Sequence, residues 1–258
     1  MPAYKNTFKN EIKQGKVQVG CWLGLADPYI AEISAGAGFD WLLIDAEHAP
    51  NDLRSIVAQL QVIAARESHA IVRPPIGETW IIKQLLDAGA QTLLIPMVES
   101  AKQAQALVKA ITYPPHGVRG VGSALARASD FAAITDYLTT ARDEICLLAQ
   151  VENQNGLNAL DEILDVDGLD GVFIGPSDLA ADMGFIGQAS APQVKKAVVE
   201  AIRKIVSSGK AAGILTLDKA LQQECQQLGA TFIATEIDVS LFARHMRSAA
   251  KAARDELS

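Results

Sequence analysis

Short apolar runs alternate with longer segments of helical period from one end of the chain to the other. Most of these runs are continuously apolar, which is typical of strands that are buried on both faces of a parallel sheet. The runs that predict strands span residues 17–25, 41–45, 70–73, 92–96, 145–152, 171–175, 211–216 and 231–235.

The segments between these runs carry the signals of helices. Asp27 and Pro28 predict a cap followed by proline in the first turn, and Asn51 predicts the cap of the next helix. Glycine closes the helical segment before several strands, as in GAGFD, DAGAQ, SSGKA and QLGAT. One apolar stripe at helical spacing is formed by Leu53, Ile56, Val57, Leu60 and Ile63.

Eight strands that are each followed by a helix predict one (β/α)₈ barrel domain of the α/β class, over residues 1–258. The alternative is an open doubly wound sheet, which usually has fewer strands and a nucleotide-binding glycine motif. The glycine cluster GVRGVG at residues 117–122 follows a Pro-Pro turn rather than a strand, so it does not fit that motif. The barrel is therefore the preferred interpretation.

Composition and charge narrow the class of protein. Hydrophobic residues make up 49% of the 258 residues, enough for a large core, and the net charge of −7 argues against nucleic acid or an anionic membrane as a partner. The three cysteines, Cys21, Cys146 and Cys225, form no C-x-x-C pair and predict buried reduced thiols. No segment approaches the ~20 apolar residues of a membrane span, and the polar N-terminus lacks a signal core, so we expect a soluble cytoplasmic protein.

Polar residues end four of the predicted strands. In such barrels the chemistry lies at the carboxyl ends of the strands, so these residues are expected to converge on one rim. They are Asp45, Glu47 and His48 after the second strand, Arg73 at the third, Gln150 and Glu152 at the fifth, and Asp178 after the sixth.

The residue types on this rim predict particular chemistry. Glu152 and Asp178 could each serve only to start a helix, but together they suit a hard cation such as Mg²⁺ or Mn²⁺. His48 follows Asp45 by three residues, a spacing that allows a hydrogen-bonded pair for proton transfer. Arg73 keeps its charge and would hold a carboxylate or an oxyanion. Glu47 is given no definite role beyond a structural contact.

A long loop, YPPHGVRGVGSALARASDF at residues 113–131, interrupts the regular alternation. Loops of this length on the face that carries the chemistry are often lids. A surface loop or a contact between subunits is an equal alternative, and both interpretations stay open.

The blocks FDWLLIDAEHAPND, IVRPP, DAGAQTLLIPMVES, QVEN and DGVFIGPSDLAADMG, with the loop itself, resemble the HpcH/HpaI aldolase family of metal-dependent pyruvate aldolases. The resemblance extends from about Phe8 to the last helix. It implies a TIM barrel that binds Mg²⁺, Mn²⁺ or Co²⁺ through Glu152 and Asp178. It also implies a homo-hexamer, a dimer of trimers, in which the last helix packs on a neighbouring barrel.

The resemblance also implies roles for single residues. Arg73 would stabilise the enolate oxygen of pyruvate, and His48, paired with Asp45, would handle the proton of the aldol hydroxyl. The remaining substrate-binding positions are Gln150 near the metal and pyruvate, Gly175, the backbone N–H groups of Ser177 and Asp178 for the carboxylate, and Trp22 and Leu215 on the pocket wall.

The implied reaction is the reversible cleavage of 4-hydroxy-2-oxo acids, foremost 4-hydroxy-2-oxoheptanedioate, in aromatic catabolism. The products would be pyruvate and an aldehyde such as succinic semialdehyde. Alternatives are an aldolase for 2-keto-3-deoxy sugar acids, a relative of acyl-CoA lyases, or a non-catalytic barrel that binds 2-oxo acids. Arg119 and Arg127 are the rim cations that a CoA ester would need, and they form no clear cluster. A lysine Schiff base is disfavoured because Lys83 and Lys210 lie away from the carboxyl ends of strands.

Three positions depart from the family pattern. Ala46 stands where relatives usually have glycine, and the ends of the last two strands, ILTLDK and IATEID, introduce Thr216 and Glu236. We expect these positions to lie near the pocket mouth and to affect the choice of aldehyde rather than the metal chemistry.

Overall fold

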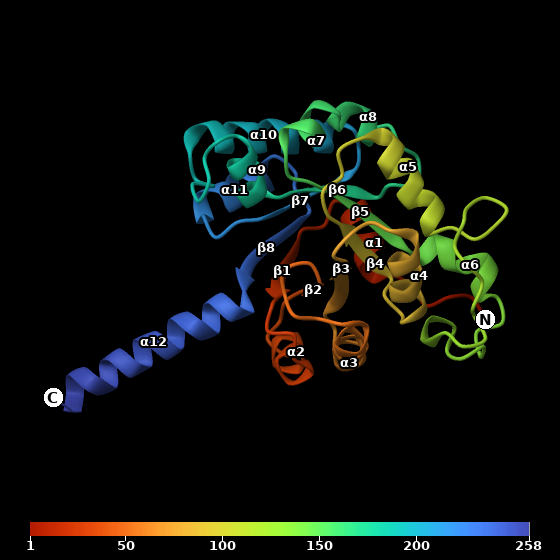
Figure 1. The fold of residues 1–258 in the computed structure, drawn as a ribbon, viewed down its shortest axis with the longest axis horizontal. Coiled ribbons are helices and arrows are strands. Elements are labelled where there is room, and N and C mark those ends of the chain that lie inside the picture. Colours follow the sequence, from red (N-terminus) through yellow and green to blue (C-terminus); the bar gives the residue numbers. More distant parts are fainter. Residues whose placement is uncertain (258) are drawn as a thin grey trace.

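The eight strands close into one parallel barrel in the order β1 to β8, as Figure 1 shows. The structure is a computed structural model that describes residues 1–257. The barrel predicted from the alternation of apolar runs is confirmed. The strands are β1 Gln18–Leu23, β2 Trp41–Asp45, β3 His69–Arg73, β4 Thr92–Ile95, β5 Cys146–Val151, β6 Gly171–Ile174, β7 Ala211–Leu215 and β8 Phe232–Ile237.

Helices surround the barrel and join successive strands (Figure 1). Asp27 caps α2 with Pro28 at the first position, as predicted. The α-helices are α1 Thr7–Lys13, α2 Pro28–Ala35, α3 Leu53–Ile63, α4 Thr79–Asp87, α5 Ala101–Ala110, α6 Tyr137–Glu144, α7 Gln154–Asn158, α8 Leu160–Leu164, α9 Pro176–Asp182, α10 Pro192–Ser207, α11 Lys219–Gln227 and α12 Asp238–Leu257. A short 3₁₀ helix, η1, covers Arg127–Ser129.

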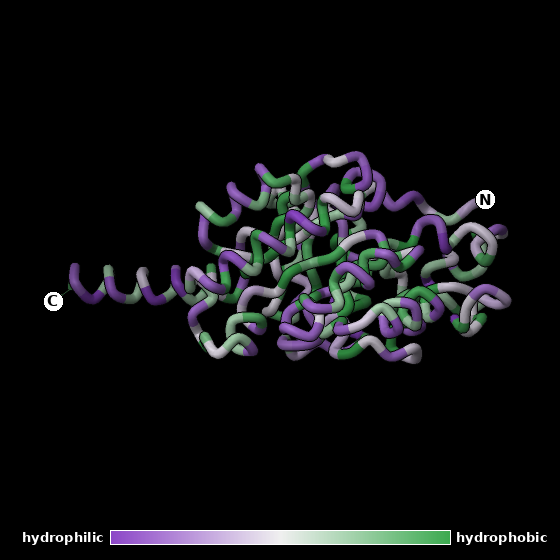
Figure 2. The backbone as a smooth tube through the Cα atoms, turned by 90° about the horizontal axis from the view of Figure 1, so that it is seen from above, coloured by the Kyte–Doolittle hydropathy of each residue, from purple (hydrophilic) through white to green (hydrophobic). Residues whose placement is uncertain are grey.

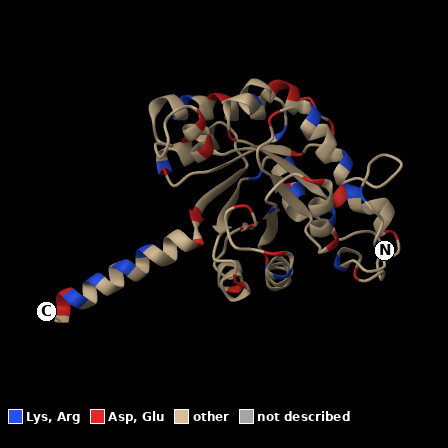
Figure 3. Cartoon of the chain, viewed as in Figure 1, with Lys and Arg blue, Asp and Glu red and all other residues tan. Residues whose placement is uncertain are grey.

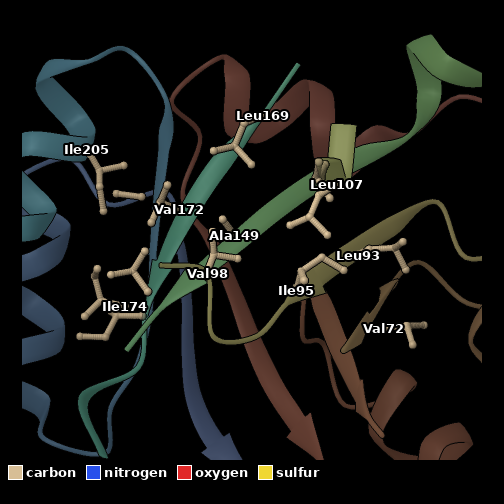
Figure 4. Packing of buried hydrophobic residues seen from close by; sticks show 14 of the residues in the cluster. Val72, Leu93, Ile95, Val98, Leu107, Ala149, Leu169, Val172, Ile174 and Ile205 are labelled. Carbon is tan, nitrogen blue, oxygen red and sulfur yellow. The ribbon is translucent and has the colours of Figure 1, made fainter. Parts of the chain in front are cut away.

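Side chains along each strand point alternately into the barrel and outward to the helices. In β2, Trp41 and Leu43 belong to the cluster inside the barrel, whereas Leu42 and Ile44 belong to the outer cluster. The outer cluster fills the space between strands and helices, as Figure 4 shows for residues such as Val72 and Ile174. Apolar segments accordingly run through the middle of the body, and hydrophilic ones dominate its surface (Figure 2).

Helix α1 closes the end of the barrel at which the strands begin. Its Phe8 is buried in the interior cluster and stacks on His69, with ring centroids 5.3 Å apart. Phe8 also meets the rings of Trp41 and Phe232 edge-on at 6.2 and 6.0 Å. Large aromatic side chains thus fill the barrel interior at this end, and in barrels of this kind the chemistry lies at the opposite end.

The loop at residues 113–131 does not cover the face predicted to carry chemistry. It joins α5 to α6 and β5, so it lies at the end where strands begin, beside the N-terminal segment. Arg119, which is fully buried, is 2.8 Å from an Asp87 carboxylate oxygen, and Arg127 donates to the Ala88 carbonyl. The lid interpretation is therefore wrong within this chain, and neither arginine lies on the rim.

Helix α12 leaves the barrel and projects away from it (Figure 1). Only Asp238 at its start is buried, while Val239, Phe242 and Met246 are exposed. Lysine and arginine recur along its length, in contrast to the uncharged middle of the strands (Figure 3). Among residues 1–257, no helix combines the length and apolar character needed to cross a membrane. The three cysteines are buried and unpaired, as predicted.

Candidate active site

A cavity of about 610 Å³ opens at the carboxyl ends of the strands. It gathers most of the residues that the sequence placed on this rim. The predicted residues that line it are Trp22, Asp45, His48, Arg73, Gln150, Gly175, Ser177, Asp178 and Leu215. Glu152 lies directly beneath this surface and is only 2% exposed.

The alternation of side chains explains why buried strands end in charged residues. Asp45 follows Leu43 by two residues and Arg73 follows Ile71 by two, so both charged side chains point into the barrel as Leu43 and Ile71 do. Asp45 and Arg73 are also direct partners in the β2–β3 register. Two adjacent strands therefore place opposite charges side by side at the floor of the cavity.

Arg73 and Asp45 form a bidentate ion pair. Arg73 Nε donates to Asp45 Oδ1 at 2.9 Å, and Nη2 donates to Oδ2 at 2.7 Å. Burial by itself would raise the pKa of Asp45, but the hydrogen bonds and charge of Arg73 lower it below its ordinary value. Arg73 also lies over the Trp22 ring, 5.1 Å from the centroid. This packing fixes the plane of the guanidinium group.

The predicted hydrogen bond between the Asp45 carboxylate and the His48 imidazole is not present. Asp45 Oδ1 instead accepts the backbone N–H groups of Glu47 at 3.0 Å and His48 at 3.4 Å. The His48 side chain is 65% exposed, and its Nε2 lies 3.8 Å from Glu47 Oε2. The pairing is wrong because the turn after β2 bends the backbone back onto Asp45, whose Oδ1 accepts backbone N–H groups, while the exposed imidazole of His48 lies near Glu47.

Glu47, for which the sequence gave no role, is the second carboxylate beside Arg73. Its Oε2 lies 3.0 Å from Arg73 Nη1. Burial raises the pKa of Glu47 above its ordinary value, although Arg73 and His48 partly oppose this. One guanidinium group therefore serves two carboxylates, and Glu47 connects it to His48.

Asn51 braces this turn rather than capping α3. The cap is Asp52, whose side chain accepts the Ser55 N–H. Asn51 Nδ2 donates to the Asp45 carbonyl at 2.6 Å, while its Oδ1 accepts from Ser55 Oγ and from Gln59 Nε2. The cap prediction was wrong by one residue, because both asparagine and aspartate suit a cap and only the backbone direction separates them.

Glu152 is held by two donors on the floor of the site. Its Oε1 accepts the Met97 N–H at 3.0 Å, and its Oε2 accepts a short hydrogen bond from the Gln150 amide. Met97 has a positive φ of 54°, a left-handed conformation that costs energy in a residue with a side chain. Burial, together with nearby Asp178 and Glu47, raises the pKa of Glu152 to about 7.

The floor has the features of a cation site. The Gln150 Oε1 atom is buried and has no hydrogen-bond partner, beside the two carboxylates of Glu152 and Asp178. A Cβ on Gly175 would lie 2.6 Å from Glu152 Oε2, so only glycine leaves this space open. Oxygen donors of this kind suit Mg²⁺ or Mn²⁺. Among residues 1–257, no group of three or more His, Cys, Asp or Glu could hold a metal, so water and substrate would complete the coordination.

The far wall of the cavity comes from the sixth to eighth strands. Ser177 and Asp178 lie in the first turn of α9, where backbone N–H groups have no partner within the helix. Of the three departures from the family pattern, only Thr216 lines the cavity. Ala46 packs toward the outer cluster, and Glu236 pairs in register with Cys21. Ala46 and Glu236 do not line the cavity themselves, but each adjoins a lining residue, Asp45 and Ile237 respectively.

Comparisons with known proteins show which family and which relatives this chain is similar to. The family profile described as HpcH/HpaI aldolase/citrate lyase matches residues 18–245. A hydroxypyruvate/pyruvate aldolase of Roseovarius nubinhibens is 59% identical over 247 residues, covering 96% of each chain. A 4-hydroxy-2-oxo-heptane-1,7-dioate aldolase of Salmonella dublin is 55% identical over 240 residues, covering 93% of this chain and 91% of that protein.

Solved structures show the same similarity. The crystal structure of a HpcH/HpaI aldolase/citrate lyase family protein from Burkholderia cenocepacia superposes with a TM-score of 0.92 at 36% identity. The superposition covers 97% of this chain and 100% of that one.

Proposed function

The chain belongs to the HpcH/HpaI aldolase/citrate lyase family and is a carbon–carbon lyase, and we propose that it is a divalent-metal-dependent aldolase for 4-hydroxy-2-oxo acids. The products are pyruvate, or hydroxypyruvate from a 3-hydroxylated substrate, and an aldehyde. The observation that carries this proposal is the floor of the cavity, where Glu152, Asp178 and an unpartnered Gln150 oxygen lie beside Arg73.

Glu152 and Asp178 would hold the metal, with Gln150 beside them. When bound, a divalent ion supplies Lewis acidity, which stabilises negative charge on a 2-oxo acid. Magnesium, manganese and cobalt are the candidate ions. The Ser177 and Asp178 N–H groups would bind the substrate carboxylate, because unpaired N–H groups at the start of a helix attract anions.

Cleavage breaks the C3–C4 bond of the substrate. The C4 hydroxyl loses its proton and becomes the aldehyde, and the electron pair of the bond passes into the 2-oxo group. A proton added at C3 then gives pyruvate. Nothing is oxidised or reduced overall, so no further reactant is needed.

Arg73 would act at the 2-oxo group of the substrate, and His48 would act at its C4 hydroxyl. The guanidinium group has five N–H donors, and its contacts with Asp45 and Glu47 engage three of them. The remaining donors can stabilise the negative oxygen of the 2-oxo group. His48 lines the cavity and is exposed, so it can take the C4 hydroxyl proton directly or through water.

The named relatives support two choices of substrate. Pyruvate and hydroxypyruvate appear in the name of the Roseovarius nubinhibens relative, and we propose them as the 2-oxo products. The second candidate is 4-hydroxy-2-oxoheptanedioate with succinic semialdehyde as product, which the name of the Salmonella dublin relative favours.

Helix α12 supports an assembly of several subunits. A 20-residue helix with exposed Phe242 and Met246 leaves apolar surface that a second copy could cover. We propose the homo-hexamer implied by the family resemblance. Native mass spectrometry of the whole chain and of Phe242→Asp tests it, because loss of the larger species in the variant is expected. A monomer in both cases would contradict the proposal.

The test of the proposed reaction is pyruvate release from a panel of 4-hydroxy-2-oxo acids. Activity should vanish in excess chelator and return with Mn²⁺ or Mg²⁺. Glu152→Gln should bind Mn²⁺ much more weakly in calorimetry, whereas the exposed Glu162→Gln is the matched control. Full activity in excess chelator would overturn the metal assignment.

A further inference from the structure

The part of the cavity that would hold the aldehyde is apolar. We infer that the aldehyde accepted by this site is uncharged, so that the preferred substrate is a 4-hydroxy-2-oxo monoacid rather than a diacid. This inference rests on the proposed aldolase function and sharpens its substrate class. The apolar wall consists of the side chains of Ala49, Ala189, Leu215, Leu217, Leu221 and Val239. The uncharged polar residues Ser190 and Thr216 also line the cavity.

Cations are scarce around this wall. Among residues 1–257, Arg73 is the only arginine or lysine that lines the cavity. Its guanidinium group contacts Asp45 at 2.7 Å and Glu47 at 3.0 Å, so two carboxylates already surround one positive charge. Arg73 also lies on the floor with the 2-oxo acid site. Arg73 is therefore already paired with Asp45 and Glu47 and is not available to a second substrate carboxylate at the far end of the cavity.

His48 is the other side chain of the lining that can carry positive charge. Its nearest carboxylate is Glu47, 3.8 Å from Nε2, so a protonated His48 already has a negative partner. The proposed reaction also uses His48 as the base that takes the hydroxyl proton. A base must be neutral for that step, which removes it as a binding site for a second carboxylate.

Lys195 on α10 contacts the lining residue Asp218, which holds it. Lys219, the residue after Asp218, is exposed and does not line the cavity. Lys195 Nζ lies 2.5 Å from Asp218 Oδ2. Asp218 is itself fixed, because its Oδ1 caps α11 by accepting the Ala220 and Leu221 N–H groups at 3.0 and 3.3 Å. A ligand carboxylate would have to displace Asp218 to reach this lysine.

The charge balance therefore works against a diacid. The second carboxylate would be placed beside apolar side chains and the acidic lining residue Asp218. A carboxylate that lies against apolar side chains without a positive partner is disfavoured, and a nearby like charge adds to that cost. An aliphatic chain of the same length meets no such penalty and gains from contact with Leu215, Leu217 and Leu221.

Two compounds of equal chain length test the inference. They are 4-hydroxy-2-oxoheptanoate, which releases butanal, and 4-hydroxy-2-oxoheptanedioate, which releases succinic semialdehyde. Pyruvate release gives kcat/KM for each with the metal-loaded full chain. We expect the monoacid to be favoured by about tenfold or more, as is typical when a pocket meets an unpaired polar group.

The possible results separate the inference about the substrate from the proposed aldolase function. An equal rate or a preference for the diacid overturns the inference and leaves the aldolase function standing. Release of pyruvate from neither compound, nor from any other 4-hydroxy-2-oxo acid, overturns the proposed function and the inference with it.

A charge placed on the wall gives a second measurement. Leu217 is 52% exposed, so Leu217→Arg adds a cation there without opening the core. We expect it to raise the kcat/KM ratio of diacid to monoacid by about tenfold, by pairing with the second carboxylate. Leu138→Arg adds the same charge on α6 and should leave the ratio unchanged. A ratio that does not move in Leu217→Arg contradicts the placement of the aldehyde against this wall.

Discussion

Arg73 and Asp45 are joined by two hydrogen bonds, at 2.9 and 2.7 Å, across the ends of two neighbouring strands. Both side chains are nearly inaccessible to water, with 5% and 3% exposure. The pair forms because each residue lies on the inward-facing side of its strand. The register of β2 and β3 places the two residues opposite each other. It orients the one guanidinium group on the floor of the cavity.

Asp45→Asn should therefore slow the reaction by misdirecting Arg73. The amide keeps the volume but loses one acceptor and the charge, so the guanidinium group would turn toward Glu47. A loss of about 100-fold in kcat is expected for a misplaced charge-stabilising group, with little change in Mn²⁺ affinity. Steady-state pyruvate release and calorimetry measure the two effects. Asp52→Asn, at the exposed cap of α3, is the control. A kcat within about twofold of the unchanged protein would contradict this role.

Gly175→Ala should weaken the metal site without disturbing the fold. A Cβ there would lie 2.6 Å from Glu152 Oε2 and 2.8 Å from Glu152 Cβ, and so would displace the carboxylate. Displacing one ligand group of a metal site typically costs about 10–100-fold in affinity. Mn²⁺ titration by calorimetry measures it. Gly36→Ala is the matched control, since its nearest atom is at an ordinary 3.5 Å. Unchanged Mn²⁺ affinity in Gly175→Ala would show that Glu152 is not a ligand.

His69 should make the fold sensitive to mild acid. Burial lowers the pKa of His69 to about 4. Between about pH 6.5 and 4 the unfolded chain binds a proton that the folded chain does not, so stability falls as the pH drops through this window. The contribution lost is at most about 3 kcal/mol.

His69→Gln tests this, because glutamine cannot titrate but can still bond to Thr92 Oγ1, which lies 2.7 Å from His69 Nε2. The free energy of unfolding, from urea titrations at pH 7 and pH 4.5, should differ less between the two pH values in the variant. His245→Gln, on the exposed part of α12, should keep the pH dependence of the unchanged protein. Parallel pH profiles for all three proteins would refute the assignment.

Much of the barrel and of the site could be predicted from the sequence. Continuous apolar runs followed by polar residues located the strand ends, because a buried strand exposes its charged residues only at the rim. The Asp45–Arg73 pair could also have been found. Residues two apart point the same way, and Asp45 and Arg73 each lie two residues beyond an inward-facing apolar residue.

The arrangement of the turns could not be derived in the same way. His48 is three residues from Asp45, and that spacing permits a side-chain pair only for one path of the chain. In the actual path Asp45 accepts backbone N–H groups, and the nearest carboxylate to the imidazole is that of Glu47. The periodicity of apolar residues predicts side-chain directions within strands and helices but not within a turn. The loop at residues 113–131 is different, because its place between a helix and the next strand already indicated the end opposite to the site.

Phe8→Ala should destabilise the barrel without affecting the site. Phe8 is 1% exposed and fills the mouth of the barrel opposite the cavity, against His69, Trp41 and Phe232. Removing a buried phenylalanine ring costs about 3–5 kcal/mol, because the transfer energy is lost and a cavity remains. Urea unfolding measures this loss, and Phe131→Ala, with a side chain that is 67% exposed, should change stability by no more than about 0.5 kcal/mol. Mn²⁺ affinity of the folded Phe8→Ala protein should stay the same, since the floor residues lie at the other end of the strands. A loss of stability below about 1 kcal/mol would show that α1 does not close the barrel, and weakened Mn²⁺ binding would show that the two ends are coupled through the aromatic interior.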